Sequence, residues 1–229
     1  VVIGGGSTGA GVVRDVAMRG FRAILLDRAD MAQGTSGRYH GLLHSGARYI
    51  ASDPESATEC AEENAIVSRI NADAVEKTGG LFVTTSVDDE DYADQFIARA
   101  RAAHVPAEEI SPAEALRREP RLDPGLKRAF AVQDGTVDGW RTARSAIAYG
   151  AEILTYTRAT GIQRSQDRIE AVFARDERSG EDIRIDCSFV LNCGGPWAGQ
   201  IAALADCHGV EVVPGAGIMI AMNHRLSQN

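Results

Sequence analysis

The sequence predicts an α/β fold built around a parallel sheet, and three observations carry this prediction. The chain opens with the apolar run Val1–Ile3, which leads into glycine-rich residues 4–9 and then into a helical pattern. A second predicted strand at 22–26, apolar from Ala23 to Leu26, follows that helix and ends at Asp27. A third apolar run, 189–191, meets another glycine turn late in the chain. Strands that alternate with helices in this way are typical of a parallel sheet that binds a ligand at its strand ends.

The first glycines have the G-x-G-x-x-G spacing of a dinucleotide-binding turn. Gly4 permits a tight turn, Gly6 lets the backbone approach a pyrophosphate, and Gly9 lets the helix pack close to the strand. Ser7 and Thr8 begin the helix, where backbone N–H groups and the helix dipole favour an anion.

The acidic end of the second strand supports the same interpretation. Asp27 lies 21 residues after Gly6, near the spacing at which a carboxylate receives ribose hydroxyls. Between them, residues 9–19 place apolar side chains on one helical face, and Gly20 ends the pattern. An ordinary glycine turn at a strand end is the alternative, but the complete β-α-β pattern favours a dinucleotide site.

The rest of the chain alternates further predicted helices and strands. Residues 30–49 predict a long loop, and the Asp/Gly-rich residues 134–139 predict a crossing between two domains. The other predicted elements are a helix capped by Asp53, a strand at 81–86, a helix at 89–103, a short helix that begins at Ser111 and stops at Pro120, a strand at 129–132, a helix at 140–149, a strand at 152–157, and a hairpin of 169–174 with 183–185.

Composition narrows the possible partners. The 229 residues allow one to two domains, and a net charge of −8 argues against nucleic acid as the main partner. The four cysteines form no C-x-x-C pair and predict reduced thiols of a cytoplasmic protein, and no set of side chains has metal-site spacing. No stretch is apolar for the length of a membrane span. Because Val1 lies inside what should be a longer strand, we expect the chain to be part of a larger protein.

Three separated segments together resemble the FAD-dependent glycerol-3-phosphate dehydrogenases. They are GGGSTG at 4–9, GTSGRYHGLLHSGARY at 34–49 and NCGGPWAG at 192–199. The closest resemblance is to the large catalytic subunit of the anaerobic, multi-subunit enzyme. It spans the whole chain but only the N-terminal part of the family's length. The resemblance implies FAD, rather than NAD, as the dinucleotide.

The glycine spacing and the resemblance together identify the candidate cofactor-binding residues. Asp27 would bind the ribose, Ala159 would meet the adenine through its backbone, and 192–194 would close over the diphosphate. Cys193 is expected to be a packing residue rather than a nucleophile. The full set is Gly4, Gly6, Ser7, Thr8, Gly9, Asp27, Arg28, Thr35, Ser36, Leu42, Leu43, His44, Ala159, Asn192, Cys193, Gly194 and Trp197.

The resemblance also implies substrate-binding and catalytic residues. Arg48 and Tyr49 resemble the pair that receives the substrate phosphate, and a guanidinium makes bidentate, charge-assisted bonds to phosphate oxygens. A surface arginine beside a packed tyrosine is the alternative. His44 is the candidate base for the substrate hydroxyl proton, because its ordinary pKa lies near neutrality. The alternative for His44 is a hydrogen bond to the flavin or to its own loop.

The expected architecture is a Rossmann-type FAD-binding domain made of 1–63 and 137–206. Residues 64–136 and 207–229 would belong to an α+β cap domain for the substrate. The expected reaction is oxidation of sn-glycerol 3-phosphate to dihydroxyacetone phosphate, with electrons sent through a partner subunit to quinone. Membrane contact, at the inner face, would come only through partner subunits. An FAD-dependent amine or 2-hydroxy-acid oxidase of the same fold and a catalytically incomplete FAD-binding fragment are the alternatives.

Overall fold

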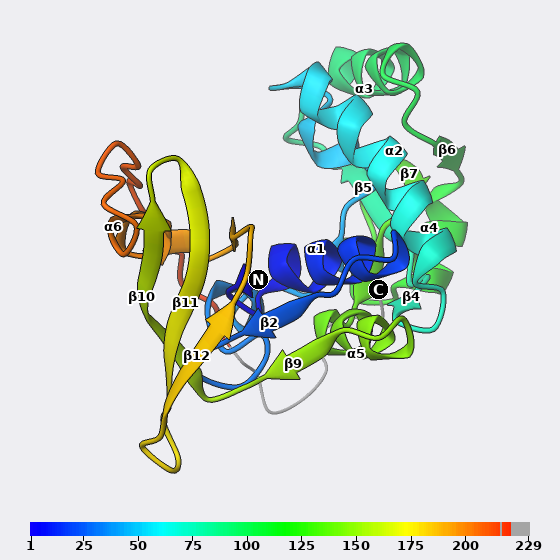
Figure 1. The fold of residues 1–229 in the computed structure, drawn as a ribbon. Coiled ribbons are helices and arrows are strands. Elements are labelled where there is room, and N and C mark those ends of the chain that lie inside the picture. Colours follow the sequence, from blue (N-terminus) through cyan, green and yellow to red (C-terminus); the bar gives the residue numbers. More distant parts are fainter. Residues whose placement is uncertain (216, 221–229) are drawn as a thin grey trace. The chain divides into compact units, whose positions relative to one another are not determined.

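The computed structural model of the chain describes residues 1–215 and 217–220, which form two compact units (Figure 1). Unit 1 comprises Val1–His40 and Asp138–Met219, and unit 2 consists mainly of Gly41–Val137. Each unit has its own sheets and its own hydrophobic core.

Unit 1 is built around a four-stranded parallel sheet with the order β13-β1-β2-β9. Helix α1 connects β1 to β2, so the predicted β-α-β unit is present and the predicted α/β class is confirmed. The elements of this layer are β1 (Val2–Ile3), α1 (Ser7–Met18), β2 (Ile24–Leu26), α5 (Gly139–Ala148), β9 (Glu152–Leu154), β13 (Leu191–Asn192) and α6 (Ala198–Ala203).

Side chains along β1 and β2 point alternately to the two faces of this sheet, and both faces are buried. Val2 and Leu25 pack in one core with α1 and α5, whereas Ile3 and Leu26 pack in another core with Val172 of the next sheet. Successive side chains of a strand point to opposite faces, so two adjacent apolar residues contact two different layers. This explains why both strands are continuous apolar runs in the sequence.

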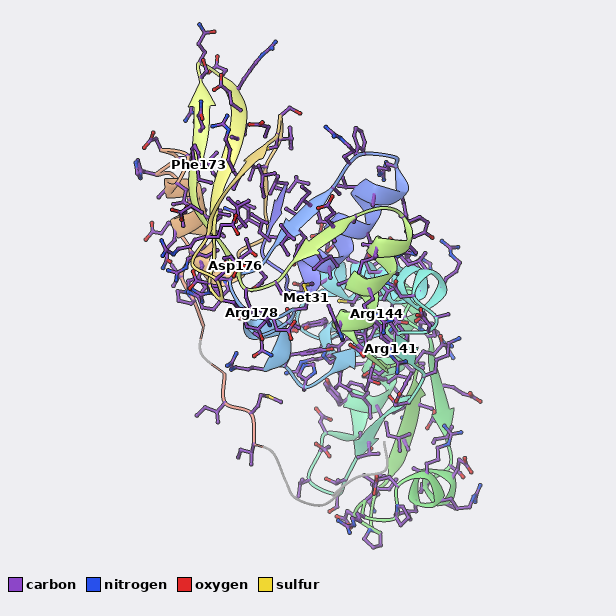
Figure 2. The ribbon with its side chains drawn as sticks, turned by 60° about the horizontal axis from the view of Figure 1, so that its bottom comes forward. Met31, Arg141, Arg144, Phe173, Asp176 and Arg178 are labelled. Carbon is purple, nitrogen blue, oxygen red and sulfur yellow. The ribbon has the colours of Figure 1, made fainter. Side chains whose placement is uncertain are left out.

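A three-stranded antiparallel sheet, β10-β11-β12, covers the second face (Figure 1). Asp176 Oδ1 closes the predicted hairpin turn by accepting backbone hydrogen bonds from Arg178 (2.7 Å) and Ser179 (2.9 Å) (Figure 2). The sequence predicts a single strand at 152–157, and this prediction is too long. Tyr156 has a left-handed φ of +54°, which interrupts the strand. The strands of this sheet are β10 (Thr157–Ser165), β11 (Arg168–Asp176) and β12 (Asp182–Asp186).

Unit 2 is an α+β arrangement with two small antiparallel sheets, in the orders β5-β7-β6 and β3-β8-β4. The rings of Phe82, Phe96 and Phe130 pack at tilted angles in its core, with centroids 5.1 Å apart in each neighbouring pair. Its elements are β3 (Leu42–Leu43), α2 (Pro54–Ile70), β4 (Val75–Glu76), β5 (Gly80–Thr84), α3 (Glu90–Ala102), β6 (Ala107–Ile110), α4 (Pro112–Arg118), β7 (Arg128–Val132) and β8 (Gly135–Val137).

The compact units have boundaries that differ from those expected from the sequence. Residues 41–63 belong to unit 2, because β3 pairs with β8 and Ala57 packs in the same core as Phe96. Residues 207–219 are grouped with unit 1, apart from residue 216, which with 221–229 lies outside the described residues. The loop-like segment around Leu42–Leu43 carries no local signal of its pairing with β8. The boundary expected from the sequence, residue 63, therefore lies later in the chain than the edge of the compact unit at Gly41.

The N-cap of α2 leads to a pH prediction. Asp53 accepts hydrogen bonds from Ser56 N (3.1 Å) and Ser56 Oγ (2.7 Å), and these bonds hold the pKa of the Asp53 carboxyl below its ordinary value. A carboxyl with a lowered folded-state pKa stabilises the fold above its unfolded pKa, and this stabilisation is lost as pH falls. Asp53→Asn keeps a neutral cap, so the difference in free energy of unfolding between wild type and variant should shrink below about pH 4.

Urea denaturation of both proteins at pH 7 and pH 3 measures this difference. An equal difference at the two pH values would contradict the prediction.

Candidate cofactor and substrate site

The first glycine turn of unit 1 leaves no room for side chains. Gly4 has a left-handed φ of +110°, and a Cβ added there would lie 2.4 Å from the carbonyl oxygen of Cys193. A Cβ on Gly9 would lie 1.8 Å from the carbonyl oxygen of Gly4, so α1 begins in direct contact with the turn. A Cβ on Gly5 would lie 2.7 Å from the sulfur of Met31. These contacts give the tight turn and the close helix packing expected of Gly4 and Gly9.

The start of α1 already holds an oxygen acceptor. Ser7 N–H donates to Ser36 Oγ at 2.8 Å, and a Cβ on Gly6 would lie 2.9 Å from that same oxygen. The first turn of α1 carries no acidic residue. The fold therefore brings Ser36, which follows Thr35 in a 3-10 turn, to the helix end where an anion is favoured.

The carboxylate of Asp27 lies at the turn itself. Its Oδ2 accepts a hydrogen bond from Gly5 N at 2.6 Å, and its Oδ1 accepts one from Ala29 N at 2.8 Å. The next residue, Arg28, places its guanidinium over the ring of Trp197, 4.3 Å from the centroid. A cation over an indole face is attracted by the ring quadrupole. Two predicted cofactor residues from opposite ends of the chain are thus in contact.

A second glycine turn follows β13, directly beside β1. Cys193 N donates to Ile3 O at 2.8 Å, and Asn192 braces the turn by accepting from Gly194 N (3.1 Å) and donating to Ala198 O (2.8 Å). Burial raises the pKa of the Cys193 thiol above its ordinary value, so the sulfur is protonated at neutral pH and unsuited to act as a nucleophile.

The residues of unit 1 fit a dinucleotide. Two glycine turns sit at the carboxyl ends of neighbouring parallel strands, where an added Cβ on Gly4, Gly9 or Gly194 would meet backbone or packed side chains, and a helix N-terminus opens at the same place. Ala159 lies in β10, opposite Ala174 of β11. Its contact with an adenine stays a prediction.

Unit 2 contains a cavity of about 470 Å³ whose wall includes three of the residues predicted from the sequence, Leu42, His44 and Arg48. Tyr49 and Leu43 are not among its lining residues. Tyr49 instead packs edge-on against His44, with ring centroids 6.1 Å apart and an interplanar angle of 80°. The wall also carries the ionisable residues Glu119, Arg121 and Asp134.

The chain matches the family described as FAD dependent oxidoreductase (DAO) over residues 1–228. It belongs to this family.

Two further comparisons place this FAD-dependent oxidoreductase among its relatives. It is 42% identical over 233 residues to a subunit of the anaerobic glycerol-3-phosphate dehydrogenase of Escherichia coli (strain K12), a match that covers 100% of the chain and 43% of that protein. The chain therefore spans less than half the length of this curated relative. In fold it is similar to L-proline dehydrogenase from P. horikoshii, with a TM-score of 0.71, 25% identity, and coverage of 90% and 55% of the two chains.

The glycerol-3-phosphate dehydrogenase from Bacillus halodurans, solved in complex with FAD, has the same fold. Its TM-score is 0.63 at 24% identity, over 89% of this chain and 35% of that one. FAD is the cofactor of the family, which confirms the expectation of FAD rather than NAD.

Some residues of this FAD-dependent oxidoreductase were missed by sequence reasoning. Met31, which Figure 2 labels, packs its sulfur against Gly5. Ala32 N–H donates to Gly5 O at 2.9 Å. In unit 2, Asp134 lines the cavity and Ser45 is buried against it. The Asp/Gly-rich residues 134–139 were interpreted as a crossing between two domains, and the division between the units after Val137 agrees with this. That pattern did not indicate that the Asp134 side chain lines a cavity.

Metal-binding clusters and membrane-spanning helices are both lacking in the described part of the chain. This part contains no helix long and apolar enough to cross a membrane. Within residues 1–215 and 217–220 there is also no cluster of three or more histidine, cysteine or acidic residues suited to a metal ion. The four cysteines, all of which the structure describes, are free.

Proposed function

We propose that this protein oxidises sn-glycerol 3-phosphate to dihydroxyacetone phosphate with FAD. The observation that carries the proposal is that Arg48 and His44 line one cavity within unit 2. An anion-binding guanidinium and a candidate base in one cavity are the two groups that a phosphorylated alcohol requires. The 42% identity to a glycerol-3-phosphate dehydrogenase supports the same substrate.

Arg48 binds the substrate phosphate in this proposal. Its guanidinium can make two parallel, charge-assisted hydrogen bonds to phosphate oxygens. Arg121 lines the same cavity and adds a second positive charge to its field. Leu42 and Phe82 form an apolar part of the cavity wall. Apolar surroundings keep the local dielectric low and strengthen the attraction between the arginines and a doubly charged phosphate. The proposed contribution of Tyr49 is to pack against the His44 ring and, through its phenol, to add a donor near the phosphate.

His44 accepts the proton of the substrate C2 hydroxyl. Bound FAD supplies the two-electron acceptor for the hydride that leaves C2. Loss of that proton and that hydride together converts the secondary alcohol into the ketone. A neutral imidazole suits this work, because its ordinary pKa lies close to neutral pH.

In the same proposal, unit 1 holds the nucleotide part of FAD. Backbone N–H groups at the first glycine turn and at the start of α1 bind the diphosphate, with the turn at Asn192 closing over it. Asp27 binds the ribose while it keeps its hydrogen bonds from Gly5 and Ala29, because each carboxylate oxygen has a further lone pair for a ribose hydroxyl. The proposed cofactor residues outside these turns are Arg28, Thr35, Ser36, Leu42, Leu43, His44, Ala159 and Trp197.

Electron transfer to a partner is also part of the proposal. The similar Escherichia coli protein is one subunit of an anaerobic enzyme, as its name states. We propose that electrons pass from this protein through a partner subunit to quinone, and that any contact with a membrane is made through such partners.

Anaerobic stopped-flow mixing tests the reaction. sn-Glycerol 3-phosphate is expected to bleach the oxidised-flavin absorption of the FAD-loaded protein, whereas L-proline, glycine and 2-hydroxy acids are not. The amino and hydroxy acids are tested because the fold is shared with a proline dehydrogenase and because arginine also binds carboxylates. Bleaching by an amino or hydroxy acid alone would identify an oxidase of that class. FAD that none of these compounds reduces would indicate an electron-relay or incomplete protein.

A further inference from the structure

Asp134 faces the imidazole of His44 inside unit 2. The distance from Asp134 Oδ2 to His44 Nδ1 is 3.8 Å, and the two side chains are 12% and 16% exposed. This distance is longer than a hydrogen bond, so the interaction is electrostatic. Both groups are largely shielded from water, which weakens screening between them.

The orientation of the Asp134 carboxylate is determined by Ser45. Asp134 Oδ1 accepts two hydrogen bonds from this one residue, from Ser45 N at 2.7 Å and from Ser45 Oγ at 2.6 Å. Ser45 is 1% exposed, so solvent does not compete for these bonds. With Oδ1 engaged in this way, Oδ2 is the oxygen directed to His44.

The backbones that carry the two side chains are tied together as well. Asn64 Nδ2, from α2, donates to Leu43 O at 3.1 Å and to Gln133 O at 3.4 Å, the residues just before His44 and Asp134. Asp134 O accepts from Gly79 N at 2.9 Å, and β3 pairs with β8 immediately after Asp134. The pair is therefore held by the strand pairing and by a side chain that bridges both segments.

We propose that Asp134 is a positioning residue that keeps the proton of neutral His44 on Nδ1 and leaves Nε2 as the nitrogen that accepts a proton. A carboxylate beside one ring nitrogen favours the tautomer with its N–H at that nitrogen. The use of Nε2 as the base rests on the proposed function, whereas the tautomer itself does not.

Other charged groups surround the same cavity. Arg48 and Arg121 disfavour a positive imidazolium, Glu119 and Asp134 favour it, and Tyr49 contributes a neutral ring edge. Asp134 acts on His44 from a short distance, 3.8 Å from Nδ1. Removing its charge should therefore change both the tautomer and the titration of His44.

Nitrogen-15 NMR of the histidine rings tests the tautomer directly in the FAD-loaded protein. His44 is assigned among the five histidines by its absence in His44→Gln. We expect the neutral ring to carry its proton on Nδ1 in wild type and in the control Glu108→Gln, an exposed charge in unit 2. We expect Asp134→Asn to shift it to Nε2, and Asp134→Glu to restore it in part. A wild-type His44 with its neutral proton on Nε2 would overturn the proposal without any variant.

Flavin reduction by sn-glycerol 3-phosphate gives the second readout. In Asp134→Asn the reduction rate constant is expected to fall about tenfold, less than the full contribution of a general base, and the pKa of its pH profile to fall by about one unit. An unchanged pH profile would overturn the role of Asp134. Failure of the wild type to be reduced would instead contradict the proposed function and leave the NMR result to decide the inference.

Discussion

Replacing Gly9 with alanine is expected to remove FAD from the protein and to destabilise unit 1. The added Cβ would lie 1.8 Å from Gly4 O, far inside any non-bonded contact, and 3.3 Å from Cys193 Cβ. The obstructing atom is backbone, so α1 must move away from the turn whose N–H groups are expected to bind the diphosphate. Overpacking of this kind costs about 3 kcal/mol. Because FAD binding must restore the closed turn against this clash, about the same amount is lost from the binding free energy, which is about a hundredfold in affinity.

Gly11→Ala is the matched control in the same helix. Gly11 is exposed, and a Cβ added there meets no atom within 4 Å. Alanine in a helix interior is favoured over glycine by about 0.5–1 kcal/mol, so this variant should retain FAD and be slightly more stable. Flavin absorbance after gel filtration, FAD titration and urea denaturation measure both effects. Normal FAD content in Gly9→Ala would show that the turn is not the binding site.

Replacing Arg48 with alanine is expected to raise the KM for sn-glycerol 3-phosphate by about a hundredfold or more. A hydrogen bond to a charged group contributes about 1.5–3 kcal/mol, and a bidentate guanidinium makes two. Arg48→Lys keeps the charge but loses the planar pair of donors, so its KM should lie between those of wild type and alanine variant. The effect is expected mainly on KM, because the charge and bonding of the phosphate do not change while C2 is oxidised.

Arg101→Ala serves as the control for loss of one positive charge from unit 2. Arg101 is exposed on α3, so its removal should leave both KM and the rate of flavin reduction unchanged. Glycerol, which lacks the phosphate, should be oxidised poorly and equally by wild type and Arg48→Ala. Equal loss of activity toward glycerol and its phosphate in Arg48→Ala would mean that Arg48 acts on the fold or on proton transfer instead.

Much of the fold was predictable because its signals are local. Hydrophobic runs, the Asp53 and Ser111 caps and the hairpin around 178–180 each depend on residues within one turn or one strand. The strand at 152–157 was predicted too long because its break is a left-handed Tyr156, a residue type that carries no turn signal.

The two parts of the candidate site, the glycine turn of unit 1 and the cavity of unit 2, were predictable to different degrees. Gly4 and Gly9 were identified from spacing, because their need for glycine arises from contacts within the same turn and with the adjoining strand. Arg48 and His44 were identified from the resemblance, but their common cavity was not visible in the chain. Asp134 was missed altogether.

By itself, the sequence determined the β-α-β unit and its glycine turn, since these follow from backbone sterics and residue order. The choice of FAD over NAD came from the resemblance of three short motifs to a known family. Only the tertiary structure decided that residues 41–63 pack with unit 2, that Asp27 braces the turn at Gly5, and that Asp134 faces His44. The physical reason is sequence separation. Ser45 and Asp134 are 89 residues apart, and no local pattern encodes which strands bring two such residues together.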